Sequence, residues 1–377
     1  MSVPSIGTPT GRWAGFGPYY AMFPIDFAFQ VVCEYCPEGG SVFDPFAGRG
    51  SSIYAAAAQE RSGLGIELNP VGWLYSKVKL RPASEGAVLR RLKELEQLTC
   101  SPTHLCNIEQ YARSLPEFFR FCYSQRVLYF LVAARQNLRW QSSQIDATLM
   151  AILLVYLHAK AGSGLSNQMR QSKAMSPSYA IRWWREHDKE PPDIDPVQWL
   201  KERIEWRYAK GLPKLHRAGV WLGDSTTQIS QVTRCISRGD TQQFNLLFTS
   251  PPYFAVTNYQ YDQWLRLWML GNLPQPVAAA ERSRGRFESK AAYWQLLLSV
   301  FSKSVPLLRD DAVIYVRTDA REFTRTTTES ILRATFPDKH VEVQKRPYSK
   351  TTQTSLFGDS STKPGDVDII LLPRTTV

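Results

Sequence analysis

One strand–turn–helix–strand pattern near the N-terminus constrains the fold of this chain more than any other feature. Ser41–Asp44 is a short apolar strand that ends in an acid, and an alanine-rich helix is predicted over Ile53–Gln59. A second strand, Gly63–Glu67, also ends in an acid. Between the first strand and the helix, Gly48 and Gly50 let the backbone approach a ligand, which the N–H groups of the helix start can bind. The pattern is typical of a doubly wound α/β sheet.

Acids at the ends of the predicted strands indicate a nucleotide-like ligand. Glu67 lies about 17 residues beyond Gly50, where an acid in nucleotide-binding folds binds two ribose hydroxyls. Asp224 follows another apolar stretch, 218–222, and could accept the amino group of an adenine or cap a helix that begins at Ser225. We therefore expect a cofactor that carries an adenosine, with a tight turn that binds no ligand as the alternative.

A second chemical signal lies at the end of the apolar run 244–248, which is followed by Thr249, Ser250, Pro251, Pro252, Tyr253 and Phe254. Proline fixes φ and has no backbone N–H, so the strand ends in a rigid turn. The Ser250 side chain and the Pro251 carbonyl can accept the two hydrogens of an exocyclic amino group, while Tyr253 stacks on a heterocycle. An ordinary Pro-Pro turn is the alternative.

Both signals resemble motifs of one enzyme family. The sequence Asp44-Pro-Phe-Ala-Gly-Arg-Gly50 resembles the DPFAGSG-type cofactor motif, and 249–254 resembles the TSPPY motif, of S-adenosylmethionine-dependent DNA amino-methyltransferases. Weaker matches are 66–70, 223–225 and 20–32, and the resemblance covers about residues 15–80 and 215–373. Arg49 stands where the family usually has a small residue.

The resemblance implies a doubly wound, Rossmann-like methyltransferase sheet and S-adenosyl-L-methionine as cofactor. The cofactor-binding residues it implies are Asp44, Phe46, Ala47, Gly48, Gly50, Glu67, Asp224 and Ser250, and the catalytic residues are Ser250, Pro251, Pro252 and Tyr253. Serine in the first position of the tetrapeptide implies methylation of cytosine N4, whereas Asp or Asn there is commoner among adenine-N6 enzymes. A restriction-modification system with a cognate endonuclease is the implied setting, and a non-catalytic DNA-binding protein on the same fold is the alternative of a different class.

Helical periodicity replaces the strand patterns in the middle of the chain. Apolar residues recur at helical spacing from Ile145 to Tyr156, for example. We expect a catalytic domain built from residues 1–80 and 213–377, interrupted by a mainly helical insertion at 81–212 that recognises the target. The insertion contains 19 Lys and Arg against 13 Asp and Glu.

The net charge of +11 indicates a polyanionic partner, which the resemblance makes double-stranded DNA. Loops rich in Arg, Lys, Asn and Ser are usual donors to phosphates and base edges. The candidate DNA contacts in such loops are Arg170, Lys173, Arg182, Arg282, Arg284 and Arg286. Solvated surface charge is the alternative for each of them.

Other features of the sequence limit the remaining possibilities. No apolar run reaches the roughly 18 residues of a membrane span and no leader pattern opens the chain, so we expect a cytoplasmic protein. Cys33 and Cys36 form a single CxxC pair and the histidines are scattered, so we expect no metal site. The first dozen residues are predicted to be a mobile arm, and 353–357 faintly resembles a peptide that docks on replication sliding clamps. The sequence does not indicate an oligomeric state.

Overall fold

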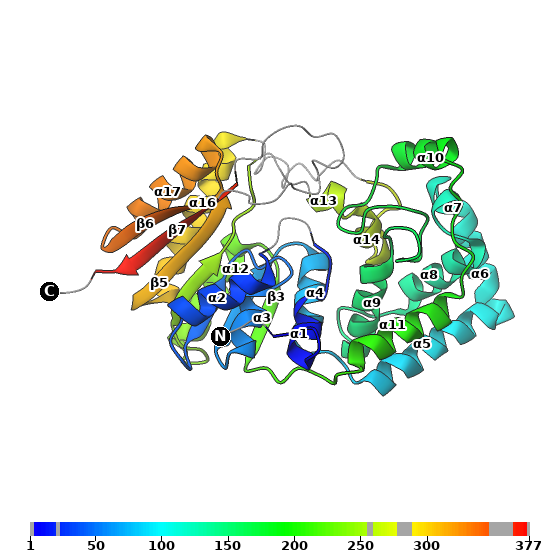
Figure 1. Cartoon of the computed structure of the whole chain (residues 1–377), viewed down its shortest axis with the longest axis horizontal. Helices are drawn as coiled ribbons and strands as arrows, with labels where there is room; N and C mark the ends of the chain where they lie inside the picture. Colours follow the sequence, from blue (N-terminus) through cyan, green and yellow to red (C-terminus); the bar gives the residue numbers. More distant parts are fainter. Residues whose placement is uncertain (1–3, 20–22, 255–258, 277–288, 347–364, 375–377) are drawn as a thin grey trace.

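A computed structural model describes residues 4–19, 23–254, 259–276, 289–346 and 365–374 (Figure 1). The stretch 353–357, which resembles a clamp-binding peptide, lies outside the described residues.

Among the described residues, seven strands form one sheet in the order β3-β2-β1-β4-β5-β7-β6. Strands β3 to β5 in that order are parallel, and β7 runs antiparallel to both β5 and β6. The sequence predicts a C-terminal hairpin from 340–343 and 367–372, which the β6–β7 pair confirms. The strands are β1 (Ser41–Asp44), β2 (Ser62–Glu67), β3 (Ala218–Leu222), β4 (Phe244–Thr249), β5 (Leu308–Asp319), β6 (Lys339–Arg346) and β7 (Asp366–Pro373).

Helices cover both faces of this sheet. Successive strand residues point to opposite sides, and both sides of these strands carry apolar residues that have to be buried. Val42 and Phe248 pack into the core on one face, whereas Phe43 and Leu247 pack into the core on the other. The first face carries α1 (Pro9–Ala14), α2 (Ile25–Tyr35), α3 (Ser51–Ala58) and α4 (Pro70–Leu80). The second carries α12 (Ser225–Ser237), α16 (Lys290–Ser304), η1 (Val305–Leu307) and α17 (Glu322–Thr335). This is the doubly wound, Rossmann-like sheet of methyltransferases, as predicted.

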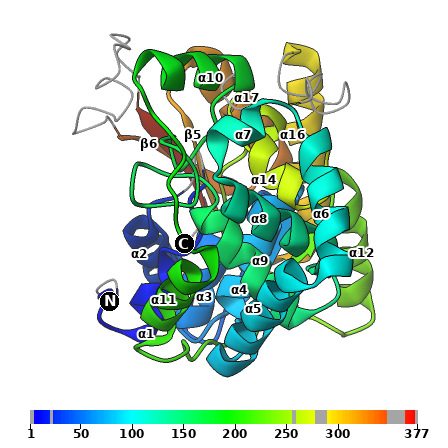
Figure 2. The same cartoon turned by 90° about the vertical axis from the view of Figure 1, so that its right-hand side faces the viewer.

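The described elements between β2 and β3 that follow α4 are all helices, and they stand beside the sheet rather than on it (Figures 1 and 2). They are α5 (Glu85–Cys100), α6 (Pro102–Ser114), α7 (Phe118–Cys122), α8 (Gln125–Asn137), α9 (Gln144–Tyr156), α10 (Pro177–Glu186) and α11 (Pro196–Tyr208). One apolar core runs without interruption from the α2–α4 layer into these helices. The functional division of the chain at residues 80 and 212 stays a prediction.

Two sequence predictions need correction. The opening residues are not an arm throughout, because Thr8 caps α1 by accepting a hydrogen bond from Gly11 N at 3.1 Å, and Trp13 is fully buried. The sequence over 259–270 predicts a single helix, but the structure has two, α13 (Tyr259–Asp262) and α14 (Trp264–Met269), separated at Gln263.

Neither Cys33 nor Cys36 forms a disulfide. In the described part of the chain, no cluster of three or more His, Cys, Asp or Glu side chains is arranged to hold a metal ion. No helix there combines the length and apolar composition that a membrane crossing requires.

Candidate active site

The two motifs meet where the strand order of the sheet reverses, between β1 and β4. Asp44 ends β1 and Thr249 ends β4, and Thr249 Oγ1 donates a hydrogen bond of 2.6 Å to Asp44 Oδ1. The carboxyl ends of strands at such a switch point form the usual ligand crevice of doubly wound sheets. One hydrogen bond thus connects the end of β4, which precedes the Ser-Pro-Pro-Tyr turn, to the end of β1, which precedes the glycine turn.

Asp44 organises this junction from a fully enclosed position. Besides Thr249, it accepts hydrogen bonds from Phe46 N at 3.0 Å and from Ser52 Oγ, at the start of α3. Burial raises the pKa of Asp44 to about 6, and the hydroxyls of Ser52 and Thr249 oppose that rise. The carboxylate therefore fixes the glycine turn, α3 and the end of β4 relative to one another.

The glycine turn has the backbone that its sequence requires. Gly48 and Gly50 have φ values of 54° and 71°, which side chains rarely adopt. A Cβ atom at Gly48 would lie 3.8 Å from the ring of Tyr19, whereas one at Gly50 would collide with Ser76. Glycine is therefore favoured at position 48 by its backbone conformation alone, and at position 50 by both its conformation and the contact with Ser76.

Arg49 has a structural role that explains its departure from the family pattern. Its side chain is buried, and Nη1 donates to the carbonyls of Gly15 and Gly17 at 3.3 and 3.0 Å. Burial lowers the pKa of Arg49 to about 10. Arg49 thus ties the glycine turn to the N-terminal segment that follows α1.

Glu67 closes the other side of the turn. Its carboxylate accepts hydrogen bonds from Gly48 N at 2.7 Å and Asn69 N at 2.8 Å. Burial raises the pKa of Glu67 to about 8, although these two backbone donors act against the rise. Phe46 is half-buried and Ala47 is buried on the turn between Asp44 and Gly48, and Ala47 N donates to Ile66 O at 3.0 Å.

Asp224 serves as the cap of α12, the alternative that its sequence context left open. Its Oδ1 accepts hydrogen bonds from Thr226 N at 2.9 Å and from Thr226 Oγ1 at 2.7 Å. A contact with an adenine amino group stays a prediction.

Two exposed apolar side chains beside these acids were missed by the sequence analysis. Leu68 follows Glu67 and is 51% exposed, and Leu222, the last residue of β3, is 37% exposed. Glu67 and Leu222 are paired across β2 and β3, so the two leucines lie at the same edge of the sheet. In the sequence, a leucine next to a strand-end acid is the signal that could have identified this apolar surface.

The Ser-Pro-Pro-Tyr turn follows β4 at that same edge. Ser250 and Tyr253 are half-buried, and Pro251 and Pro252 are buried. The Tyr253 hydroxyl donates to Asp366 Oδ1 at 3.1 Å, a contact that no motif predicts. The ring of Phe254 packs edge-on against the ring of Phe323, with 4.9 Å between the centroids.

A segment of the helical insertion lies across α13 and α14, which follow the Ser-Pro-Pro-Tyr turn in the chain. Ala174 N donates to Asp262 O at 3.0 Å, Gln263 Nε2 to Ser172 O at 3.1 Å, and Trp264 Nε1 to Met175 O at 3.0 Å. Lys173 Nζ lies 2.6 Å from Asp262 Oδ1. Four consecutive residues of the insertion, 172–175, therefore attach to the helices next to the predicted catalytic turn.

The ion pair gives Lys173 a structural role in addition to its predicted contact with DNA. The Asp262 side chain is only 2% exposed, whereas that of Lys173 is 42% exposed. Removing one partner of a fully buried ion pair costs about 3–5 kcal/mol. Because this pair is partly exposed, we expect Lys173→Met to lower the free energy of unfolding by about 2 kcal/mol, measured by urea denaturation without nucleic acid.

Arg170→Met is the matched control, because Arg170 is exposed in the same segment. It should change the free energy of unfolding by less than about 0.5 kcal/mol and should weaken DNA binding at low salt. Equal losses of stability in the two variants would contradict the role assigned to the Lys173–Asp262 pair.

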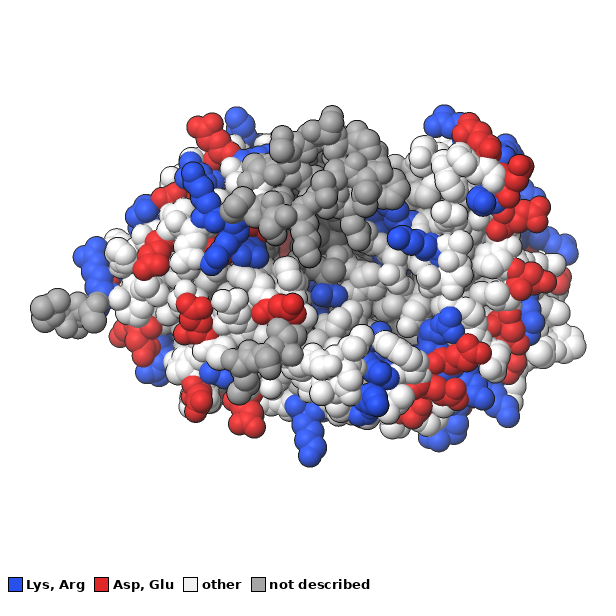
Figure 3. Space-filling view, in the orientation of Figure 1, with Lys and Arg blue, Asp and Glu red and all other residues white. Residues whose placement is uncertain are grey.

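The other predicted DNA contacts are placed only in part. Arg182 is exposed on α10, which lies at the upper right of Figure 1. Arg282, Arg284 and Arg286 lie outside the described residues. Figure 3 shows Lys and Arg side chains on both sides of the upper middle of one face, whereas acidic and basic side chains are mixed over the helices at its right.

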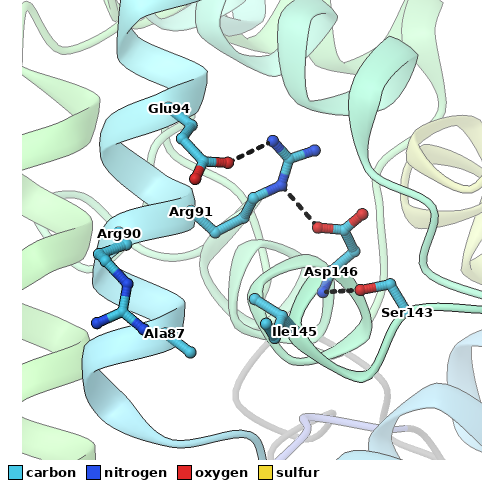
Figure 4. A pocket seen from close by; sticks show the side chains of 7 residues that line it. All are labelled: Ala87, Arg90, Arg91, Glu94, Ser143, Ile145 and Asp146. Atoms are coloured by element: carbon cyan, nitrogen blue, oxygen red, sulfur yellow. Dashed lines mark hydrogen bonds and ion pairs between the residues drawn. The ribbon is translucent and has the colours of Figure 1, made fainter.

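A pocket of about 290 Å³ lies away from this site, between α5 and α9 (Figure 4). Arg91 stands between two acids in its lining, 2.7 Å from Asp146 and 2.9 Å from Glu94. Because these charges already compensate one another, we assign the pocket no ligand. Its lining residues are Ala87, Arg90, Arg91, Glu94, Ser143, Ile145 and Asp146.

Comparisons with known proteins give a local match in sequence and distant likenesses in structure. No family model matches the sequence. The type II methyltransferase M.MvaI of Kocuria varians is 28% identical over 119 residues, which cover 29% of this chain and 26% of that protein. The match thus spans about a quarter of that relative's length.

Solved methyltransferase structures show a distant likeness. The rRNA methyltransferase aviRa from Streptomyces viridochromogenes superposes with a TM-score of 0.36 and 13% identity over 96% of this chain and 90% of its own. A putative SAM-dependent methyltransferase from Streptococcus mutans gives a TM-score of 0.33 and 8% identity over 93% of this chain and 49% of its own. TM-scores this low do not establish a common function.

Proposed function

We propose that this chain is an S-adenosylmethionine-dependent methyltransferase that methylates the exocyclic N4 of cytosine in double-stranded DNA. The observation that carries the proposal is the 2.6 Å hydrogen bond from Thr249 to Asp44. It brings a glycine turn suited to an adenosine-bearing ligand next to a Ser-Pro-Pro-Tyr turn suited to an amino group, at the switch point of the sheet. The local similarity to a type II methyltransferase supports the methyltransferase part of the proposal.

The residues around the glycine turn fit this cofactor. Glu67 is a buried acceptor for two ribose hydroxyls, and the exposed side chain of Leu68 offers an apolar surface to an adenine ring. When bound, S-adenosylmethionine supplies a methyl group on a positively charged sulfonium, near the half-buried ring of Phe46.

The catalytic turn has to make a poor nucleophile reactive. The lone pair of an exocyclic amine is delocalised into its ring, so the nitrogen must be drawn toward sp³ geometry and aligned with the methyl group. Ser250 Oγ and the Pro251 carbonyl accept hydrogen bonds from the two hydrogens of the amino group, and Tyr253 stacks on the flipped base. The nitrogen would gain the methyl carbon as the carbon–sulfur bond breaks, and it would release one proton to water.

The cofactor proposal predicts a pH dependence of binding. Ribose hydroxyls donate to an ionised carboxylate, but Glu67 has a pKa of about 8 in the free protein. Because the native state holds this proton more tightly than the unfolded chain, Glu67 should make the unliganded protein less stable as the pH rises from about 4.5 to about 8. Cofactor affinity should rise with pH, because the Glu67 carboxyl releases its proton when the cofactor binds. The rise should be at most about tenfold per pH unit and should end near pH 8, the pKa of Glu67.

Isothermal titration calorimetry between pH 6.5 and 9, in buffers of different ionisation enthalpy, measures both the affinity and the released proton. Glu67→Gln cannot ionise and should bind more weakly with a flat dependence above pH 7, where Asp44, with a pKa of about 6, is mostly charged. A wild-type affinity that does not change across this range would contradict the assignment of Glu67 to the ribose.

The proposed function is tested by treating unmethylated DNA with the purified protein and S-adenosylmethionine and identifying the modified nucleosides by mass spectrometry. We expect N4-methylcytosine with the wild type and none with Ser250→Ala. N6-methyladenine would keep the enzyme class but overturn the base assignment. Neither product on several DNAs of different sequence would contradict a DNA substrate and direct the search to RNA or protein.

A further inference from the structure

The hydroxyl of Tyr253 is anchored to a strand far away in the sequence. It donates to Oδ1 of Asp366, the first residue of β7 and 113 residues further along the chain. Pro251 and Pro252 restrict the backbone before Tyr253, but they do not restrict its side-chain torsions. The hydrogen bond restricts the first of these torsions, χ1, because it fixes the far end of the ring.

Asp366 lies among charges of both signs. Across the antiparallel β5–β7 pair it lies opposite Asp319, and like charges directly opposite each other are unfavourable. Burial and the nearby Asp366 both raise the pKa of Asp319. Burial lowers the pKa of Arg317, but Asp368 and the nearby Asp366 raise it, so Asp366 also attracts that guanidinium.

We infer that Asp366 is a positioning residue that holds the tip of the Tyr253 ring at the place where the ring stacks on the flipped base, an inference that rests on the proposed function. Stacking requires the two rings to overlap, so a ring whose tip is free to swing loses part of the contact. Asp366 is inferred to act through Tyr253 and not by contact with the base or the cofactor.

The inference separates Asp366 from a residue that only supports the fold. A structural residue would lose activity and stability together when replaced. For Asp366→Ala we expect kcat to fall about tenfold, the factor that one lost hydrogen bond produces, with an unchanged KM for S-adenosylmethionine. The thermal unfolding midpoint should change little, because Asp319 loses the carboxylate that faces it while Arg317 loses an attraction.

A double-mutant cycle tests whether the effect passes through the tyrosine. Tyr253→Phe keeps the ring and removes the donor, so it should lower kcat as Asp366→Ala does, and the double variant should be no slower than either single variant. Asp366→Asn keeps an acceptor and should retain most of the wild-type kcat. Asp311→Ala, on the exposed part of β5, is the control and should have no effect.

A readout without turnover keeps this inference distinct from the proposed function. With 3-fluorotyrosine at position 253, the ¹⁹F resonance reports the surroundings of the ring, and Asp366→Ala should shift it while Asp311→Ala should not. Absence of methyl transfer by the wild type would overturn the proposed function, and with it the stacking role inferred for Asp366. An unshifted resonance, multiplicative effects on kcat in the double variant, or a kcat loss that follows a loss of stability would overturn the inference alone.

Discussion

Ser250→Ala is expected to lower the rate of methyl transfer by at least about a hundredfold, the loss typical when one preorganised polar contact to a reacting group is removed. Ser250 is half-buried at the end of β4, where its hydroxyl is proposed to accept an amino hydrogen. The contact that holds this strand end to the glycine turn belongs to Thr249 and is left in place. S-adenosylmethionine binding should therefore persist, as measured by calorimetry beside a radioactive methyl-transfer assay.

Tyr253→Ala provides a second variant on the catalytic side, because stacking of a base on an aromatic ring contributes about 1–3 kcal/mol. We expect it to lose methyl transfer and to keep cofactor binding, as Ser250→Ala does.

Asp44→Ala is the contrasting variant for this prediction. It leaves the hydroxyls of Ser52 and Thr249 and the backbone N–H of Phe46 without their acceptor. Each buried donor left unsatisfied costs about 1–3 kcal/mol, so cofactor binding and stability should fall together. Full activity in Ser250→Ala and Tyr253→Ala, or undiminished cofactor binding in Asp44→Ala, would show that the site lies elsewhere.

The elements around the glycine turn could be predicted because their signals are local. Ser41–Asp44 was predicted with the bounds that the structure has, and the helix and second strand that follow differ by one or two residues at their starts. Apolar periodicity, a strand-end acid and glycines at positive φ all act within a few residues. Such signals identify the glycine turn and the Ser-Pro-Pro-Tyr turn separately.

The contacts that join these elements could not be predicted, because they depend on how distant segments pack. Asp366 has no motif around it, and its contact with Tyr253 exists only because β7 enters the sheet beside β5. Lys173 resembles a phosphate ligand in its polar loop, and only the fold places the buried Asp262 next to it. A charge pattern in the sequence predicts exposure to solvent, and it does not identify a charge that the fold has buried.

Arg266 is the strongest example of such a buried charge. Its side chain on α14 is completely enclosed, and burial lowers the pKa of its guanidinium from the usual range. Nε donates to Leu154 O at 2.8 Å, Nη1 to Gln263 Oε1 at 2.7 Å, and Nη2 to Gln171 O. Leu154 lies in the last turn of α9, whose carbonyls have no partners within the helix. A cation there also interacts favourably with the helix dipole.

Arg266 therefore connects α14, which follows the Ser-Pro-Pro-Tyr turn, to two parts of the helical insertion. Arg266→Met keeps the apolar stem but leaves the buried carbonyl of Leu154 and the half-buried carbonyl of Gln171 unpaired, at about 1–3 kcal/mol each. We expect the free energy of unfolding, measured by urea denaturation, to fall by about 3 kcal/mol or more. Arg126→Met is the control, because the Arg126 side chain is 59% exposed in its ion pair with Asp195, and such surface pairs contribute about 0–1 kcal/mol.

The shape of the unfolding transition gives this prediction a second, independent test. Because one core continues from the sheet into the insertion, the wild type should unfold in a single transition. Without Arg266 the attachment between α14 and the insertion weakens, so the insertion should lose its structure at a lower urea concentration than the sheet. Equal effects of Arg266→Met and Arg126→Met on the free energy of unfolding would mean that apolar packing alone holds the insertion against α13 and α14.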